Sequence, residues 1–184
     1  TWNEENRLAA GAGGDPENGL TELGREAVRR MQRLGIVPDV SHASDGTFRD
    51  LLKLAEGPVI ASHSNCRALC DVRRNLTDDQ LRAIRDTGGV VGVNVYHNFV
   101  HADPQQQTAA MLARHAAHMA EVMGPEHVAC GFDFCEYFGP GNEGCEGMED
   151  CSQTHNFFFE LERIGFSAAE RQAIAGENLL RVLE

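Results

Sequence analysis

Apolar residues along the chain follow two alternating patterns, one with helical spacing and one in short continuous runs. Six segments place apolar side chains three or four positions apart, the spacing of one helix face: 21–34, 44–55, 76–89, 104–123, 154–163 and 168–183. Four apolar runs separate the earlier helices and are expected to be strands buried on both faces: 36–41, 58–62, 90–96 and 127–134. This order predicts parallel βαβ units.

Local signals mark several helix ends. Thr77 is expected to be the N-cap of its helix, and Ser167 with Glu170 forms a capping-box motif. The long helical segment before the fourth strand is expected to begin at Pro104. The last helix is expected to break near Gly176.

Two α/β architectures fit this order, a doubly wound open sheet and part of a (β/α)8 barrel. No glycine-rich phosphate loop follows a strand, which weakens the nucleotide-binding form of the open sheet. A full barrel takes about 250 residues, and only four strands are visible in these 184 residues. We therefore expect 1–184 to be one domain, the C-terminal part of a TIM-like barrel without its N-terminal strands. Its open sheet edges should pair with the missing half or with a second copy, as a homo-oligomer.

Composition excludes some classes of function. The formal charge of −12 argues against binding nucleic acid or an anionic membrane surface, because both repel an acidic protein. No apolar run approaches the roughly 20 residues that span a bilayer. No signal-peptide pattern is visible either, so a cytoplasmic location is favoured.

Three of the six cysteines lie in an acidic, glycine-rich stretch near the C-terminal third of the chain. Cys135, Cys145 and Cys151 form the pattern C-x9-C-x5-C-x3-H with His155, which could in principle hold a structural zinc ion. The pattern lacks a close C-x2-C pair, so free thiols or a local disulfide are favoured over a zinc site.

Two histidines occupy matching positions at the ends of consecutive predicted strands. His42 closes "PDVSH" and His63 closes "PVIASH". Neighbouring strands lie about 4.8 Å apart, so both imidazoles can reach one metal ion at the carboxyl edge of the sheet. Asp133 ends the fourth strand in "CGFDF". Two imidazoles and a carboxylate at one rim predict a hydrolytic metal site of the zinc type.

Ordinary structural roles are possible for the same residue types. Asp133 can cap a turn, and Arg74 in "RRNLTDD" can be a solvated surface residue or a guanidinium that grips a substrate carboxylate. His97 and His101 are four positions apart after the third strand, so they form a secondary candidate pair.

These residues stand in motifs by which the chain resembles the renal (membrane) dipeptidase family. These are zinc metallopeptidases with a (β/α)8 barrel of the metal-dependent hydrolase type. The motifs run through the whole chain in the family's order: "GLTELGREAVRRMQRLGIVPDVSHAS", "PVIASHSNCRALC", "RRNLTDDQLRAI", "GGVVGVNVYHNF", "CGFDF" and "ENLLRVLE".

The resemblance implies specific roles. His42 and His63 match the histidines that ligate the second of two zinc ions. Arg74 matches the arginine that binds the substrate's C-terminal carboxylate, and Asp133 matches the aspartate that handles the proton and helps hold the substrate's amino group. Tyr96 matches an aromatic residue that lines the pocket.

The chain departs from the family pattern in two ways. The H-x-D pair that holds the first zinc and the glutamate that bridges both ions are expected to precede Thr1. Trp2 stands where many members have a histidine that stabilises the tetrahedral intermediate.

The resemblance implies a metal-dependent dipeptidase that cleaves dipeptides through a water activated by two zinc ions. Two alternatives remain open. The same barrel can act on another amide or lactam, or this part of it can be a non-catalytic scaffold that lacks the first metal site.

Overall fold

The computed structural model describes residues 3–184, and four parallel chain segments form its centre. Strands β1 (Val91–Val93) and β2 (Val128–Cys130) pair in parallel. Segments 36–41 and 58–62 continue the array, each through one isolated parallel bridge. The four segments follow one another in space in their chain order, with no reversal. A doubly wound sheet contains a reversal and a barrel does not, so the arrangement is an arc of a (β/α)8 barrel.

The strands in the structure are shorter than the apolar runs from which they were predicted. Segment 36–41 pairs with segment 58–62 through a hydrogen bond of 2.8 Å from the N–H of Val40 to the C=O of Ile60. Segment 58–62 pairs with the start of β1 through a hydrogen bond of 3.0 Å from the N–H of Ala61 to the C=O of Val90, the residue before β1. β1 ends at Val93 because the following residue, Asn94, bonds its backbone N–H to a side chain instead of to a strand.

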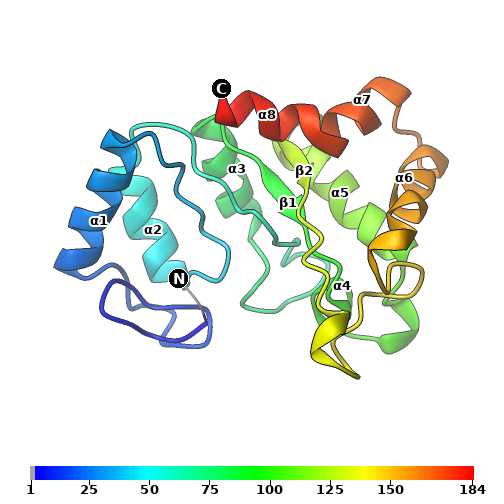
Figure 1. Ribbon diagram of the computed structural model, residues 1–184, viewed down its shortest axis with the longest axis horizontal. Helices are drawn as coiled ribbons and strands as arrows, with labels where there is room; N and C mark the ends of the chain where they lie inside the picture. Colours follow the sequence, from blue (N-terminus) through cyan, green and yellow to red (C-terminus); the bar gives the residue numbers. More distant parts are fainter. Residues whose placement is uncertain (1–2) are drawn as a thin grey trace.

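Helices surround the arc (Figure 1). Their bounds are, in chain order, α1 (Glu22–Arg33), α2 (Asp45–Leu54), α3 (Asp78–Asp86), α4 (His97–Val100), α5 (Ala109–Met123), α6 (Thr154–Arg163), α7 (Ala168–Gln172) and α8 (Asn178–Leu183). Short 3-10 turns occupy Pro104–Gln106, Pro125–His127, Glu136–Phe138 and Cys151–Gln153, and a π-helical turn occupies Ala173–Glu177.

The predicted caps are confirmed. Thr77 accepts from the backbone of Gln80, and the Gln80 side chain bonds back to the Thr77 N–H. Ser167 and Glu170 form the same reciprocal pair at the start of α7. Each pair satisfies backbone N–H groups that the first turn of a helix leaves without partners.

One predicted helix begins at a different residue in the structure. The helix expected from Pro104 begins at Ala109, because Thr108 has an extended backbone and caps α5 there. Pro104 starts a separate 3-10 turn. The expected break near Gly176 is confirmed, because a π-helical turn at Ala173–Glu177 interrupts the α-helix between α7 and α8. The short helix α4 was not predicted, since four residues carry no helical periodicity.

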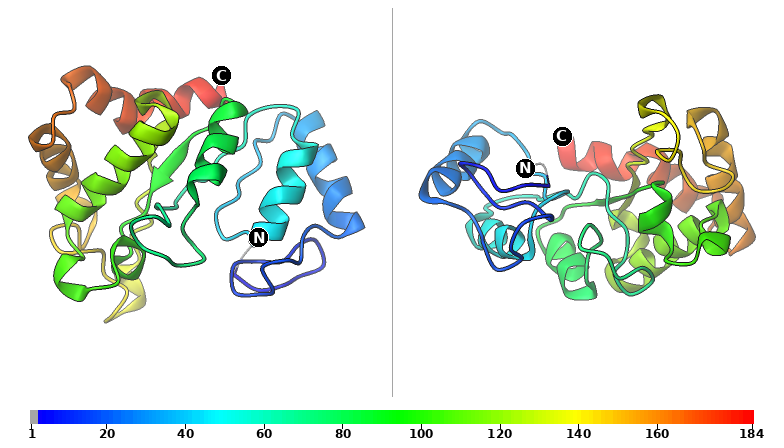
Figure 2. Two further views of the ribbon diagram at one scale, coloured as in Figure 1. Left: turned by 180° about the vertical axis from the view of Figure 1, so that it is seen from behind. Right: turned by 90° about the horizontal axis from the view of Figure 1, so that it is seen from below.

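Alternate strand residues face two different cores. Val91, Val93 and Val128 pack in the main core, which also contains Leu81 of α3 and Leu112 of α5. Val90 and Ala129 point to the other face and pack with Leu179 and Val182 of α8. The right-hand view in Figure 2, seen from below, shows α8 (red) on the opposite side of the strands from α3 and α5 (green). Within residues 3–184, no helix combines the length and apolar character needed to cross a bilayer.

Candidate active site

His42 and His63 lie at the carboxyl ends of neighbouring segments, as the sequence predicts. Their rings meet edge to face, with centroids 4.9 Å apart and planes inclined by 63°. His42 has a φ of +70°, in the left-handed region. A non-glycine residue held there costs on the order of 1–3 kcal/mol. The surrounding fold therefore keeps this histidine in place against a local conformational cost.

Asp133 follows β2 and faces the histidines. Its Oδ2 lies 3.9 Å from Nε2 of His63 and accepts a hydrogen bond from Nδ2 of Asn94 at 3.2 Å. Asp133 has a φ of +62°, so it is, like His42, a non-glycine residue with a positive φ. Among residues 3–184 these are the two such positions, and strained backbone of this kind clusters at functional sites.

Both histidines are held neutral. Burial lowers the pKa of His42 to about 4, with the charge of Arg74 and the neighbouring His63 acting in the same direction and Asp133 opposing them. Burial also lowers the pKa of His63, although Asp133 raises it. The approach of His63 to Asp133 is therefore not an ion pair at physiological pH. Neutral imidazole is the form that binds metal ions.

The guanidinium of Arg74 is largely buried. Its Nε and Nη2 are buried and form no hydrogen bond within the described part of the chain. Its guanidinium carbon lies 5.3 Å from the ring centroid of Phe99. Burial lowers the pKa of Arg74 to about 10, against the raising effect of Asp133 and Asp39. Buried donors are normally paired, so these two N–H groups are available to donate to a further acceptor.

Tyr96 and Arg74 both contact the ring of Phe99. Its ring contacts Phe99, with centroids 4.9 Å apart, and Phe99 in turn lies under the Arg74 guanidinium. Nδ2 of Asn98 donates to the Tyr96 hydroxyl at 3.3 Å. Tyr96 thus borders the Arg74 region, and its contact with a substrate remains a prediction.

Three buried asparagines link the segments that carry these residues, and the sequence analysis did not single them out. Asn65, Asn75 and Asn94 are each fully buried. Asn65 Nδ2 donates to the carbonyl of Asn94 at 2.8 Å, and Asn75 Oδ1 accepts from the Asn65 N–H at 3.3 Å. The signal was present in the sequence as a polar residue inside the apolar run "VGVNVY" and an asparagine directly after Arg74.

His97 and His101, the secondary candidate pair, bond to different partners. His97 Nδ1 bonds the carbonyl of Glu143, whereas His101 Nδ1 accepts from the N–H of Asp103. All six cysteines are free thiols. His155 Nδ1 bonds the carbonyl of Ser152. Cys135, Cys145 and Cys151 form no disulfide within the described residues. Trp2 lies outside the described residues.

The donors of His42 and His63 fit a zinc ion in chemistry, since neutral imidazole nitrogen is a common zinc ligand. Within residues 3–184, however, no group of three or more histidine, cysteine, aspartate or glutamate side chains is close enough to hold a metal ion. His42 and His63 thus supply two imidazole donors, fewer than the three or four protein ligands of a typical zinc site.

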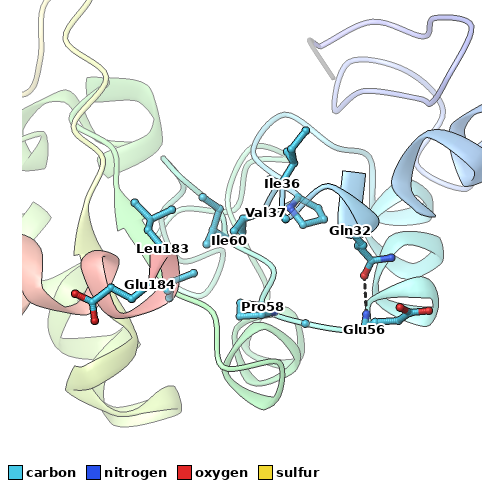
Figure 3. A pocket seen from close by; sticks show the side chains of 12 residues that line it. Gln32, Ile36, Val37, Glu56, Pro58, Ile60, Leu183 and Glu184 are labelled. Carbon is cyan, nitrogen blue, oxygen red and sulfur yellow. Dashed lines mark hydrogen bonds between the residues drawn. The ribbon is translucent and has the colours of Figure 1, made fainter. Parts of the chain in front are cut away.

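Two cavities lie beside the strand segments, and Ile60 lines both of them. One of about 290 Å³ is lined by His63 and Asp133 together with Ser62, Gly92 and Gly131. A larger one of about 600 Å³ lies at the amino ends of the strand segments, between the end of α8 and residues such as Val37 and Ile60. Figure 3 shows this larger cavity, where Glu56 N–H donates to Oε1 of Gln32. It holds none of the predicted site residues, so the smaller cavity belongs to the candidate site.

A family model and several known proteins match this chain along nearly all of its length. The family model described as membrane dipeptidase, peptidase family M19, matches residues 1–184. A Klebsiella pneumoniae protein, described only by its location in the pqqA 5′ region, is 36% identical over 192 residues, which cover 100% of this chain and 69% of that protein. A Schizosaccharomyces pombe protein described as an uncharacterised dipeptidase is 36% identical over 95% of this chain and 42% of its own length.

Solved structures share the fold. A metallopeptidase from Rhodobacter sphaeroides, crystallised with a phosphinate mimic of the dipeptide L-Ala-D-Ala, superposes with a TM-score of 0.88 at 30% identity. The match covers 100% of this chain and 53% of that one. A second metallopeptidase, described as the dipeptidase AC of family M19, superposes with a TM-score of 0.89 at 30% identity and is covered to 54%. The chain therefore spans about half the length of these metallopeptidases.

Proposed function

The chain belongs to the membrane dipeptidase family, peptidase family M19, and we propose that it forms the C-terminal part of a zinc dipeptidase that hydrolyses dipeptides. One observation carries the proposal: two neutral imidazoles, His42 and His63, meet beside the carboxylate of Asp133 at the carboxyl edge of a barrel arc. This edge is where barrel enzymes place their chemistry.

Arg74 is proposed to bind the substrate's C-terminal carboxylate. Its unpaired Nε and Nη2 lie along one edge of the guanidinium, and two parallel N–H donors match the two oxygens of a carboxylate. A bound carboxylate would also balance the positive charge of Arg74, which is costly in the low dielectric of its buried surroundings. Tyr96 is proposed to line the pocket close to this end of the substrate.

Asp133 is proposed to move the proton during hydrolysis. One of its carboxylate oxygens accepts the proton of the attacking water and later delivers it to the leaving amine. Asn94 Nδ2 holds the Oδ2 oxygen, which fixes the orientation of the carboxylate. When bound, two zinc ions would lower the pKa of the attacking water and polarise the scissile carbonyl, and His42 and His63 would hold one of them.

The phosphinate mimic of L-Ala-D-Ala bound to the Rhodobacter sphaeroides metallopeptidase supports a dipeptide as the substrate class. The incomplete ligand set supports a further element of the proposal, which is that this chain works together with an N-terminal half that supplies the remaining zinc ligands. Association with a second copy would be an additional route to covering its open sheet edge.

The incomplete ligand set also favours a second candidate, in which this chain is a non-catalytic scaffold. Turnover by the full-length, zinc-loaded protein separates the possibilities. L-Ala-D-Ala, the C-terminal amide of the same dipeptide and an N-acyl amino acid are offered as substrates. We expect the free dipeptide to be hydrolysed and its amide to be a far poorer substrate.

Each contrary outcome has a distinct meaning. Equal cleavage of the dipeptide and its amide would contradict the role of Arg74 and favour another amide or lactam as the substrate. No turnover of any substrate by fully zinc-loaded protein would favour the scaffold.

A further inference from the structure

A chain of side-chain hydrogen bonds runs from His63 through Ser62 to Asp39. Nδ1 of His63 lies 2.7 Å from Oγ of Ser62. The same hydroxyl donates to Oδ2 of Asp39 at 2.5 Å. None of the roles implied by the family resemblance uses Ser62 or Asp39.

The chemistry of these groups fixes where the protons lie. A carboxylate only accepts hydrogen bonds, so the single hydroxyl proton of Ser62 points at Asp39. Ser62 Oγ can then only accept from His63, and Nδ1 of His63 must carry a hydrogen. The lone pair of Nε2 is consequently free, and Nε2 is the atom that faces Asp133 at 3.9 Å.

The second site histidine has the same arrangement, and a core histidine has the opposite one. Nδ1 of His42 lies 2.8 Å from the amide oxygen of Asn3, an acceptor, so His42 also carries its hydrogen on Nδ1. Nδ1 of the fully buried His115 instead accepts from the Cys66 N–H, and its Nε2 donates to the carbonyl of Val100. The tautomer of each ring therefore follows from its own partner.

Asp39 also ties together the backbones of the two strand ends. Its Oδ1 accepts from the N–H of Ser41 at 2.9 Å and from the N–H of Ser62 at 3.0 Å. The hydroxyl of Ser41 accepts from the His63 N–H at 2.9 Å. One carboxylate thus fixes the spacing of both segments and the tautomer of one ring.

We propose that Asp39 is a positioning residue which, through Ser62, fixes His63 as the Nδ1–H tautomer and so presents its Nε2 lone pair to the metal. The part of the proposal that concerns metal rests on the proposed function. Partners of this kind orient metal-binding histidines, and their loss typically weakens metal affinity by about 10- to 100-fold.

The test uses Asp39→Asn in protein labelled with ¹⁵N-histidine and freed of metal. The side-chain NH₂ of asparagine would donate to Ser62 Oγ, and Ser62 would then donate to His63 Nδ1. We expect the His63 ring signals to change from the Nδ1–H to the Nε2–H pattern, while those of His115 stay as they are. Ser62→Ala, which removes the relay with little change in volume, is expected to release the preference for Nδ1–H. Asp86→Asn, a change of the same type at an exposed helix end, serves as the matched control.

The second measurement is the zinc affinity of the full-length protein, obtained by competition with a chromophoric chelator. Asp39→Asn and Ser62→Ala are expected to weaken it by about 10- to 100-fold relative to Asp86→Asn. If His63 keeps its Nδ1–H pattern in Asp39→Asn, the relay is refuted, and Ser62→Ala decides the matter by the same spectrum if Asp39→Asn does not fold.

A changed tautomer with unchanged zinc affinity would refute the metal role. If the unmodified protein binds no zinc, the proposed function fails, whereas the ring spectra still decide whether Asp39 positions His63.

Discussion

Replacing Arg74 with methionine is expected to stabilise the folded protein and to remove the contact with a substrate carboxylate that we propose for Arg74. Burial lowers the pKa of Arg74 to about 10, against an ordinary value of about 12.5. The difference corresponds to a cost of about 3 kcal/mol for keeping the charge in the folded state. Because the folded-state pKa is the lower one, this cost is fully present at neutral pH, begins to fall as the pH rises past about 10 and is lost only above the unfolded-state pKa of about 12.5.

The substitution also removes a favourable contact. The guanidinium over Phe99 contributes roughly 1 kcal/mol, so a net gain of about 2 kcal/mol remains. For a chain of this length each kcal/mol shifts the Tm by about 2–4 °C, which gives an increase of about 4–8 °C. Two charge-assisted hydrogen bonds to a substrate carboxylate contribute about 1.5–3 kcal/mol each. Their loss lowers kcat/KM by about 10²- to 10⁴-fold.

Thermal unfolding followed by circular dichroism and kinetics with L-Ala-D-Ala measure the two effects. Arg73→Met is the matched control, because Arg73 is the exposed neighbour and its Nη1 donates to the carbonyl of Gly14 at 3.0 Å. It should change neither quantity by much. A variant at Arg74 that is no more stable than the parent and keeps its kcat/KM would refute the reasoning.

Three further predictions concern the ligands, the core and the strand packing. His42→Ala or His63→Ala is expected to abolish zinc-dependent turnover in the full-length protein and to lower its bound zinc, measured by atomic emission; full activity in either variant would remove that histidine from the site. Burial lowers the pKa of His115 to about 4, against about 6.5 in the unfolded chain. Stability present above pH 6.5 should thus be lost as the pH falls, by about 2 kcal/mol at pH 5. Urea unfolding should show a smaller loss in His115→Gln, and an equal loss would assign the pH dependence to other groups. Gly131→Ala would place a Cβ 1.6 Å from the carbonyl oxygen of Ser62 and should destabilise the fold by at least about 2 kcal/mol. Gly57→Ala, which meets nothing within 4 Å, should be tolerated in the same unfolding assay.

The sequence by itself determined the elements whose causes are local. The caps at Thr77 and Ser167 could be predicted because each joins groups three residues apart. The order of helices and apolar runs determined the α/β class. It also placed His42 and His63 at strand ends, since parallel strands present their carboxyl ends at one edge. The start of α5 was misplaced because a proline after aspartate marks a 3-10 turn as readily as a long helix.

The sequence favoured a barrel over an open sheet, but only the tertiary structure showed the spatial order of the four strand segments, because that order depends on contacts between segments far apart in the chain. The tertiary structure also decided which polar groups serve the site. Asp39 reaches Ser62 across 23 positions of sequence and Asn94 reaches Asp133 across 39. Such hydrogen bonds form only after the chain has folded and water has left. The candidate ligands could therefore be proposed from local sequence, whereas the groups that orient them could not.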